Sequence, residues 1–197
     1  VHFVFAPTPE EMYTPEEMQQ PFSFDFNGLD TVMEGKMRPG HFNGVVQVVS
    51  RLFELVRPTR AYFGEKDFQQ LAIIRHMVDQ SSLAGQFEGL KIIGCPIVRE
   101  KSGLAMSSRN ERLSENEKQI AVGISKTLIS SVEWAKNTSV EDVKQRVIDT
   151  INAIDGLEVE YYEIVDKTTL QPTNTFQNAI GCVTVYCGPV RLIDNIQ

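Results

Sequence analysis

Residues 60–98 read RAYFGEKDFQQLAIIRHMVDQSSLAGQFEGLKIIGCPIV, and this stretch decides the fold. Residues 60–63 are typical of a short strand, and residues 68–79 then place apolar side chains at helical spacing. Residues 91–94 form a second apolar strand, which residues 96–98 extend. Two strands joined by a helical crossover of this length favour a parallel sheet with helices on its faces.

The sequence before this stretch is less regular. Residues 1–5, VHFVF, have the pattern of a buried strand, and residues 6–20 contain three prolines, which indicate a loop. Residues 42–56 carry apolar side chains at helical spacing, and Pro58 ends this helix. Because a buried strand normally has neighbours that come earlier in the sequence, we expect the chain to be part of a larger protein.

The organisation changes after residue 98. Ser114 and Ser139 each precede an acidic residue by three positions, which is the spacing of a helix N-cap, and apolar residues at helical spacing follow both. Strand-like runs come next, at residues 159–165, 180–186 and 190–193. Two helices and then three strands predict a separate α+β unit. We therefore expect an α/β protein with a parallel-sheet domain over residues 1–97 and a smaller α+β domain over residues 98–197.

The composition is that of an ordinary globular protein. Of the 197 residues, 42% are hydrophobic and 23% are charged, and no apolar run approaches the roughly 20 residues that span a bilayer. Lys and Arg number 19 against 26 Asp and Glu, which gives a formal net charge of −7. An acidic chain is not built to bind a nucleic-acid backbone, although a local basic pocket for a small phosphate ligand is compatible with it.

The cysteines show no pattern of a disulfide framework or a zinc site. Cys95, Cys182 and Cys187 are odd in number and lack Cys-x-x-Cys spacing, so we expect buried thiols in a reducing cytosol. Cys182 and Cys187 lie five positions apart in a strand-like run and should therefore point to opposite faces. The three histidines form no metal-binding constellation, and we predict no metal site.

The first candidate site is the turn Gly64, Glu65, Lys66 and Asp67, where a strand ends and a helix begins. Unpaired backbone N–H groups and the positive helix end meet at such a turn, so it can hold an anionic phosphate. Lys66 adds a positive charge, and Asp67 can accept hydrogen bonds from ribose hydroxyls. In the alternative interpretation, Asp67 caps the helix with Gln70 and Lys66 is merely solvated. The turn is not a Walker loop.

The second candidate is the cluster Met106, Ser107, Ser108 and Arg109, which follows Gly103. Two hydroxyls and a guanidinium in three consecutive residues make a compact set of donors suited to a polyphosphate. The alternative is a turn that leads to the Ser114 helix. For a third segment, residues 34–41, we favour a structural or loop-ordering role for its arginine and histidine over a catalytic one.

Taken together, these segments resemble the pantothenate synthetases, the pantoate–β-alanine ligase family of the nucleotidyltransferase-like superfamily. The matching stretches are EGKMRPGHFNGVVQVVSRLFELVRP from Glu34, AYFGEKDFQQL from Ala61, PIVREKSGLAMSSRNERLS from Pro96 and VRLIDNI from Val190. They keep the family's order and spacing over nearly all of the chain. The resemblance implies an incomplete Rossmann-like sheet for residues 1–97 and a C-terminal lid domain for residues 98–197.

The activity that the resemblance implies is an ATP-dependent condensation. In this family pantoate reacts with Mg-ATP to give pantoyl adenylate and pyrophosphate, and the amine of β-alanine then displaces AMP. Both steps need charge stabilisation and alignment more than a covalent nucleophile. ATP with Mg²⁺ is thus expected as a co-substrate, and no tightly bound cofactor is expected. We also expect a cytoplasmic homodimer that binds neither nucleic acid nor a membrane.

The resemblance also assigns residues. Gly64, Glu65, Lys66 and Asp67 would bind ATP, with Lys66 on phosphate, and Gln70 would hydrogen-bond pantoate. Val98 would contact the adenine base of ATP. The counterpart of the family's KMSKS loop would place hydroxyls and a guanidinium on the phosphates, and it consists of Met106, Ser107, Ser108 and Arg109.

The chain departs from the family at its beginning. The His-x-Gly-His signature of the first nucleotide motif has no match in the 197 residues, nor has an early pantoate-binding glutamine. In the family the two histidines of this signature stabilise the departing phosphates, and the loss of a single electrostatic contact of this kind lowers a rate by about 10²–10³. We therefore expect this chain alone to be inactive or nearly so. Two alternatives stay open: a related nucleotidyltransferase with a different acid substrate, and an inactive, dimerising fragment that serves as a binding module.

Overall fold

Two small sheets form the framework of the chain, which a computed structural model describes for residues 2–83 and 85–197. Strand β1 (Arg60–Gly64) pairs in parallel with β2 (Lys91–Cys95). Strands β3 (Leu157–Asp166), β4 (Ala179–Cys187) and β5 (Val190–Ile196) form an antiparallel sheet in the order β3-β4-β5. The predicted fold class, a parallel sheet with helices followed by a smaller α+β part, is confirmed.

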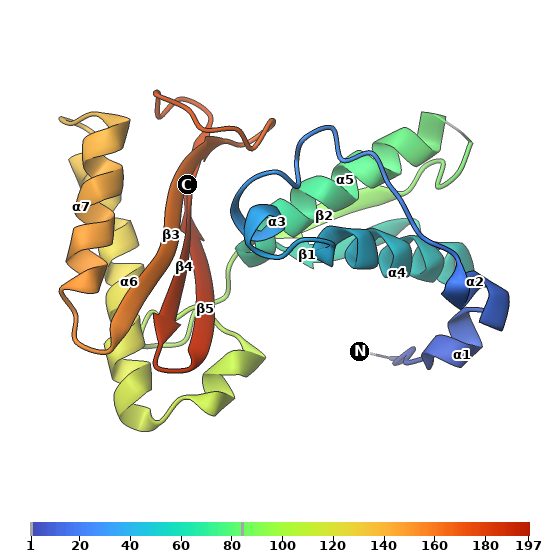
Figure 1. Ribbon diagram of the computed structural model, residues 1–197, viewed down its shortest axis with the longest axis horizontal. Helices are drawn as coiled ribbons and strands as arrows, with labels where there is room; N and C mark the ends of the chain where they lie inside the picture. Colours follow the sequence, from blue (N-terminus) through green and yellow to red (C-terminus); the bar gives the residue numbers. More distant parts are fainter. Residues whose placement is uncertain (1, 84) are drawn as a thin grey trace.

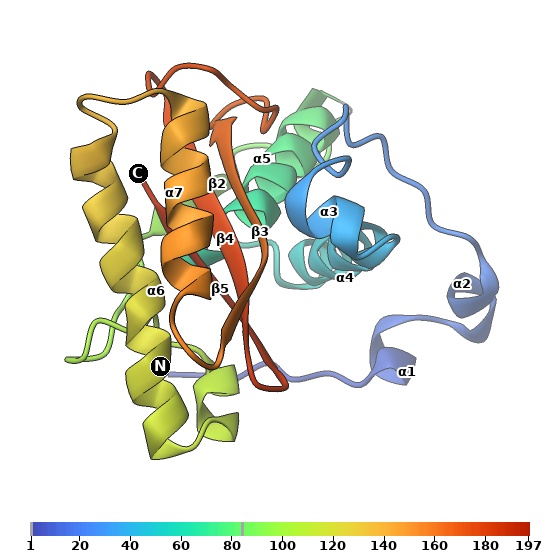
Figure 2. The ribbon, with the colours of Figure 1, turned by 60° about the vertical axis from the view of Figure 1, so that its left-hand side comes forward.

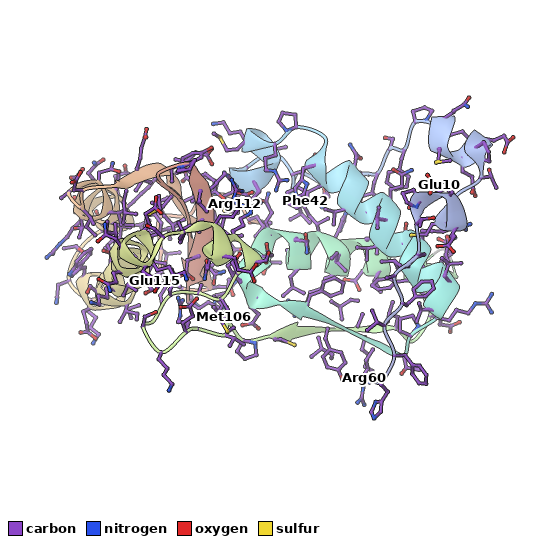
Figure 3. The ribbon with its side chains drawn as sticks, turned by 90° about the horizontal axis from the view of Figure 1, so that it is seen from below. Glu10, Phe42, Arg60, Met106, Arg112 and Glu115 are labelled. Atoms are coloured by element: carbon purple, nitrogen blue, oxygen red, sulfur yellow. The ribbon has the colours of Figure 1, made fainter. Side chains whose placement is uncertain are left out.

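Two long helices cover the parallel sheet. Helix α4 (His41–Val56) packs against α5 (Phe68–Leu83), and α5 packs against β1 and β2. Figure 3 shows the two helices on one side of these strands. The short helix α3 (Met33–Met37) precedes α4, and the 3-10 turn η1 (Glu65–Asp67) joins β1 to α5. This is the strand, turn, helix and strand order that the sequence predicts.

Two helices also cover one face of the antiparallel sheet (Figure 2). They are α6 (Glu115–Trp134) and α7 (Val140–Asn152), and the 3-10 turn η2 (Ser108–Arg112) precedes α6. The side chains of Ser114 and Ser139 accept hydrogen bonds from the backbone of the third helical residue, so both predicted N-caps are confirmed.

Opposite faces of the antiparallel sheet contribute to two hydrophobic cores. Cys187 lies with α6 and α7 in one core, and Cys182 lies in the other with residues of α4 and α5. The predicted opposite orientation of these two cysteines is confirmed, because successive side chains alternate across a strand. The antiparallel sheet therefore stands between α6–α7 and the first half of the chain (Figure 1).

The predicted structure of the first 20 residues is wrong in two places. Residues 2–5 form no strand and pair with no strand in the described part of the chain, and Phe3 and Val4 are exposed. A strand needs a hydrogen-bonding neighbour, which an apolar pattern cannot supply. The predicted loop over residues 6–20 contains the short helices α1 (Pro9–Met12) and α2 (Pro15–Gln19).

Local capping chemistry explains these two helices. Thr8 and Thr14 each form a capping box with the glutamate three residues on, and a proline follows each threonine at the first helical position. The prolines thus begin helices here instead of marking a loop.

The predicted extension of the second strand over residues 96–98 is also wrong. Strand β2 ends at Cys95, and Pro96 has no N–H to continue the ladder.

Among residues 2–83 and 85–197, no helix combines the length and hydrophobicity that crossing a membrane requires.

Candidate active site

A cavity of about 290 Å³ lies where the first half of the chain meets the antiparallel sheet. Residues of α3, α4 and the η1–α5 segment line one side, and residues of η2, β3, β4 and β5 line the other. Four cationic side chains face it: Arg38, Lys66, Arg109 and Arg191. The carboxylates of Glu34, Asp67 and Asp194 also line the cavity, so its cations outnumber its anions by one, and this excess favours an anionic ligand there.

Two helices begin at this cavity. Gly40 adopts a left-handed conformation, with φ of 80°, at the N-cap of α4, and the next two residues line the cavity. The start of α5, with Phe68, Gln69 and Gln70, lines it as well. Helix N-termini carry free N–H groups and partial positive charge, so both add to the attraction for an anion.

The η1 turn holds Lys66 at the cavity. The backbone carbonyls of Glu65 and Lys66 accept hydrogen bonds from Nδ2 of Asn195, at 2.8 and 3.0 Å. Gly64 is the N-cap residue of this turn and provides no side-chain cap. The predicted cap of α5 by Asp67 is not among the side-chain hydrogen bonds found for the described residues. Asp67 is exposed and lines the cavity.

The Ser107–Arg109 cluster approaches from the opposite side. The Ser107 hydroxyl caps η2 by accepting a hydrogen bond from the Arg109 backbone N–H at 3.2 Å. Nη1 of Arg109 donates to the carbonyl of Arg191 at 3.0 Å. Asn110 fastens the preceding loop, because its Nδ2 donates to Oε1 of Glu100 and to the Ala105 carbonyl. The predicted turn before the Ser114 helix and a basic side chain at the cavity are therefore both present.

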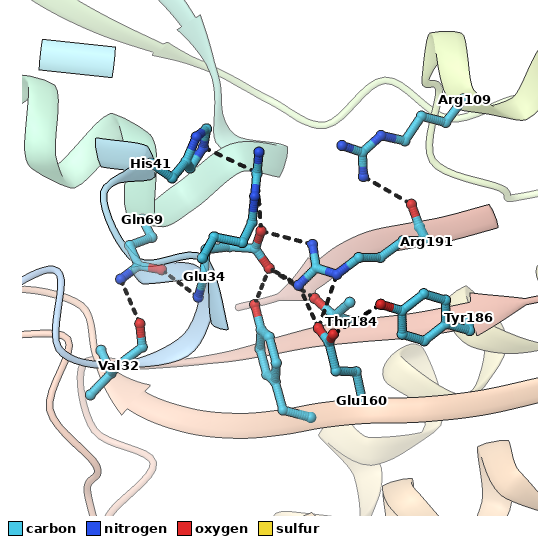
Figure 4. A network of polar contacts seen from close by, with 11 residues as sticks. Val32, Glu34, His41, Gln69, Arg109, Glu160, Thr184, Tyr186 and Arg191 are labelled. Carbon is cyan, nitrogen blue, oxygen red and sulfur yellow. Dashed lines mark hydrogen bonds and ion pairs between the residues drawn. The ribbon is translucent and has the colours of Figure 1, made fainter. Parts of the chain in front are cut away.

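A partly buried ion-pair network lies beside these groups (Figure 4). Nη1 and Nη2 of Arg191 donate to the two carboxylate oxygens of Glu34, at 2.8 and 2.6 Å, and Arg191 also donates to Glu160. The hydroxyls of Tyr161 and Thr184 donate to Oε1 of Glu34, at 2.8 and 3.1 Å. Glu160 sits at a β-bulge between its two neighbours on β3, a feature that redirects side chains near active sites.

The network fixes the charge states of its members. Burial alone would raise the pKa of Glu34, but hydrogen bonds from Arg191, Tyr161 and Thr184 and the charge of Arg191 lower it to about 2. Burial and the Glu34 charge raise the pKa of Tyr161. The two carboxylates raise the pKa of Arg191 despite its burial. Glu34 is thus an anion that pairs with Arg191 and, at 3.6 Å, with Arg38, which leaves Lys66 and Arg109 as the less compensated cations.

Arg38 and His41 interact directly. Nη1 of Arg38 lies 3.1 Å from Nε2 of His41 and 3.6 Å from the Glu34 carboxylate. Because a guanidinium only donates, Nε2 of His41 accepts, and the proton of the neutral ring is on Nδ1. Burial and the positive charge of Arg38 lower the pKa of His41. This contact agrees with the loop-ordering role predicted for the pair, although both side chains also line the cavity.

The structure brings six of the predicted site residues to the cavity wall. They are Lys66, Asp67, Gln70, Ser107, Ser108 and Arg109. The other four, Gly64, Glu65, Val98 and Met106, do not line it. Val98 and Met106 have 64% and 54% of their surface exposed and lie side by side, because the Met106 N–H donates to the Val98 carbonyl at 2.9 Å. Figure 3 shows Met106 near the junction of the two halves.

Sequence reasoning assigned no role to Glu34, Arg191 and Asn195, although Glu34 begins the third candidate segment. Arg191 and Asn195 belong to VRLIDNI, in which polar residues interrupt a strand that is otherwise apolar. Charged residues in a buried strand are normally paired, so this interruption was a usable signal for a buried ion pair. Nothing in the neighbouring sequence indicated that the partner of Arg191 is Glu34, which lies 157 residues away.

In the part of the chain that is described, no group of three His, Cys, Asp or Glu side chains is placed to hold a metal ion.

Comparisons with known proteins agree on one family. The sequence model described as "Pantoate-beta-alanine ligase" matches residues 1–197. A pantothenate synthetase of Phocaeicola vulgatus is 57% identical over 198 residues, which cover 99% of this chain and 68% of that protein. A pantothenate synthetase of Bacteroides fragilis is 55% identical, with 99% and 67% covered. The chain thus spans about two thirds of the length of these relatives.

Solved structures give the same result. The crystal structure of pantothenate synthetase from Thermus thermophilus superposes with a TM-score of 0.86 at 38% identity, covering 98% of this chain and 68% of that one. A pantoate-beta-alanine ligase from Francisella tularensis, complexed with Beta-gamma ATP and β-alanine, superposes with a TM-score of 0.63 at 32% identity. That match covers 85% of this chain and 54% of the other.

Proposed function

The chain belongs to the pantoate–β-alanine ligase family, and from this premise we propose that its residues serve the ATP-dependent condensation of pantoate with β-alanine, with little or no turnover by these 197 residues alone. In the first step, a carboxylate oxygen of pantoate attacks the α-phosphorus of Mg-ATP, and the bond to the β-phosphate oxygen breaks to release pyrophosphate. In the second, the amine of β-alanine attacks the acyl carbon of pantoyl adenylate. The bond to AMP then breaks, and the amine loses a proton.

One observation carries this proposal. Lys66 and the Ser107–Arg109 cluster come from different parts of the chain and line the same cavity, together with the N-termini of two helices. Charge develops on pyrophosphate as it leaves, and positively charged groups already held in place stabilise it most effectively. The complex of the Francisella tularensis relative with Beta-gamma ATP and β-alanine supports a nucleotide and β-alanine as ligands.

The proposed roles follow the positions of the side chains. Lys66 and Arg109 contact the phosphates from opposite walls, and the hydroxyls of Ser107 and Ser108 donate to phosphate oxygens. Asp67 contacts the ribose, and Mg²⁺ enters with ATP as part of the substrate. Gln70, at the start of α5, hydrogen-bonds pantoate.

The adenine base is proposed to lie outside the cavity itself. Val98 and Met106 are exposed apolar side chains that a backbone hydrogen bond holds together. The bound base would cover them, while the backbone of Gly64 and Glu65 borders the nucleotide from the end of β1.

Isothermal titration with Mg-ATP tests the proposal. The chain should bind Mg-ATP, and Lys66→Ala should weaken binding at least about tenfold, since a hydrogen bond to a charged group is worth roughly 1.5–3 kcal/mol. Lys136→Ala is the matched control, because Lys136 is exposed and pairs only with Glu133 in the described structure. Absence of ATP binding would instead favour an inactive binding module.

Pyrophosphate release distinguishes the other alternative, a nucleotidyltransferase with a different acid substrate. With the family's His-x-Gly-His segment joined to the chain and ATP present, pantoate should stimulate release, and Gln70→Ala should raise the KM for pantoate without changing that for ATP. Release with another small carboxylic acid, and none with pantoate, would contradict the pantoate assignment.

A homodimer is the proposed assembly, supported by the outer face of α4. Val48, Leu55 and Val56 have 44%, 45% and 54% of their surface exposed, whereas Val45 and Val49 pack against the core. Sedimentation velocity should give about twice the 22.2 kDa of one chain. The pair of changes Val48→Glu and Leu55→Glu should give the monomer, while Val132→Glu on α6 should not.

Two further expectations from the sequence stay predictions. They are the division into domains between residues 97 and 98, and the cytoplasmic location.

A further inference from the structure

Strand β5 contacts both groups that the proposed function places on the triphosphate. Near its start, the carbonyl of Arg191 accepts a hydrogen bond from Nη1 of Arg109 at 3.0 Å. Near its end, the side chain of Asn195 donates to the carbonyls of Glu65 and Lys66 at 2.8 and 3.0 Å. The two contacts are four residues apart, or about 13 Å along an extended strand. One rigid element therefore sets the spacing between the two walls.

Asp194 fixes the direction of Asn195 and of the loop that leads to Ser107. The carboxylate of Asp194, which is 5% exposed, accepts hydrogen bonds from both terminal nitrogens of Arg99, at 2.6 and 2.9 Å. Nη1 of Arg99 also donates to the Gly103 carbonyl, and Oδ1 of Asp194 accepts from the Asn195 backbone N–H at 2.8 Å. Asn195 is thus held at its backbone, and only 3% of the residue's surface is exposed in this arrangement.

Asn195 suits this task chemically. A single –NH₂ group satisfies two successive carbonyls, and these acceptors determine which end of the amide is nitrogen. The η1 turn has no side-chain cap among the described residues, so Asn195 supplies the side-chain contact that holds it. Without that contact, each of the two carbonyls would lose one hydrogen bond and the turn that carries Lys66 would lose its link to β5.

We propose that Asn195 is a positioning residue, which orients the Lys66 turn toward the phosphates while Arg191 on the same strand fixes Arg109. This inference rests on the proposed function, because its readout is nucleotide affinity. Asn195 touches no phosphate itself and acts through Lys66.

The test compares ATP with AMP. Titration of Asn195→Ala should show about tenfold weaker Mg-ATP binding and less than about twofold change for AMP, since the lost contacts serve the β- and γ-phosphates. In a chain that already carries Lys66→Ala, Asn195→Ala should weaken Mg-ATP binding by less than a further factor of about two. Asn152→Ala is the matched control: it removes a side-chain contact to the Val159 backbone N–H, neither residue lines the cavity, and both affinities should stay unchanged.

Each result has a definite meaning. Equal losses for ATP and AMP, or additive losses with Lys66→Ala, would overturn the positioning role, as would unchanged ATP affinity. If Asn195→Ala does not fold, Asn195→Ser, which fills more of the space, is measured in the same way. If the unsubstituted chain binds no ATP, the proposed function fails and this inference falls with it; if it binds ATP and only the Asn195 results disagree, the proposed function stands.

Discussion

Arg191 on β5 and Glu34 on α3 form a bidentate ion pair although they lie 157 residues apart in the sequence, and its two N–O distances are 2.8 and 2.6 Å. Their side chains are 15% and 14% exposed, so solvent screens the pair only weakly. It joins the antiparallel sheet to the first half of the chain beside the cavity.

Glu34→Gln should lower the free energy of unfolding by about 2 kcal/mol. Breaking a buried pair costs about 3–5 kcal/mol when a charge is left alone, but Arg191 keeps its contact with Glu160. Urea unfolding followed by circular dichroism measures the change. Glu133→Gln, which removes an exposed pair with Lys136, is the control and should have no measurable effect. An equal effect of the two substitutions would contradict the account.

The stability of the chain should fall in acid partly through Glu34. Its pKa is about 2 in the folded chain against an ordinary 4.5, so protons bind the unfolded state more readily. The contribution of Glu34 is therefore complete above about pH 4.5 and is lost as the pH falls toward 2. Unfolding curves between pH 6 and pH 2, on the order of one per pH unit, should show a flatter pH dependence for Glu34→Gln than for the unsubstituted chain. Parallel profiles would show that Glu34 is not the group responsible.

The imidazole of His41 should titrate below 6.5, because burial and the charge of Arg38 lower its pKa. Arg38→Met should raise this pKa by removing the nearby positive charge. Lys36→Met, which removes an exposed cation of the same short helix, should leave it unchanged. Titration of the His41 ring signals by NMR provides the measurement. A pKa that does not respond to Arg38→Met would rule out the direct contact in solution.

Gly35→Ala should destabilise the chain by more than about 3 kcal/mol. An added Cβ would lie 2.0 Å from the carbonyl oxygen of Asp30, and this backbone atom cannot move away cheaply. Gly44→Ala in α4 is the matched control. Its Cβ would meet nothing within 4 Å, so the change should be neutral or stabilise the helix by about 0.5–1 kcal/mol. Thermal unfolding of both variants gives the comparison, and similar melting temperatures would contradict it.

In a protein that joins the family's His-x-Gly-His segment to this chain, Arg109→Ala should lower kcat for pantoate-dependent pyrophosphate release more than it raises the KM for ATP. The guanidinium is expected to act mainly as charge builds on the leaving pyrophosphate, and such contacts are worth about 10²–10³ in rate. Steady-state kinetics over a range of ATP concentrations separates the two constants. An effect confined to KM would show that Arg109 contributes only to ground-state binding.

Local patterns predicted most of the helices and strands. The helices after Ser114 and Ser139 and the strands from residue 157 onward follow apolar periodicity, a property of neighbouring residues. The position of Lys66 at a strand-to-helix turn was equally local. Residues 2–5 show the limit of such reasoning, because their apolar alternation exists without a strand partner.

Long-range pairing explains what sequence reasoning missed at the site. Glu34 reads as an ordinary polar residue of a short helix, and only folding brings it to Arg191, Tyr161 and Thr184. The contact of Asn195 with the η1 turn spans 129 residues in the same way. That Lys66 and Arg109 line one cavity agrees with the sequence-based expectation, whereas the strand that supports both was not foreseen.

A crystal structure of the chain with Mg²⁺ and a non-hydrolysable ATP analogue tests most directly whether Lys66 and Arg109 bind one triphosphate from two sides. The account predicts phosphate oxygens within about 3.2 Å of both Nζ of Lys66 and the guanidinium of Arg109. A nucleotide bound elsewhere, or phosphates that contact only one of these side chains, would contradict it.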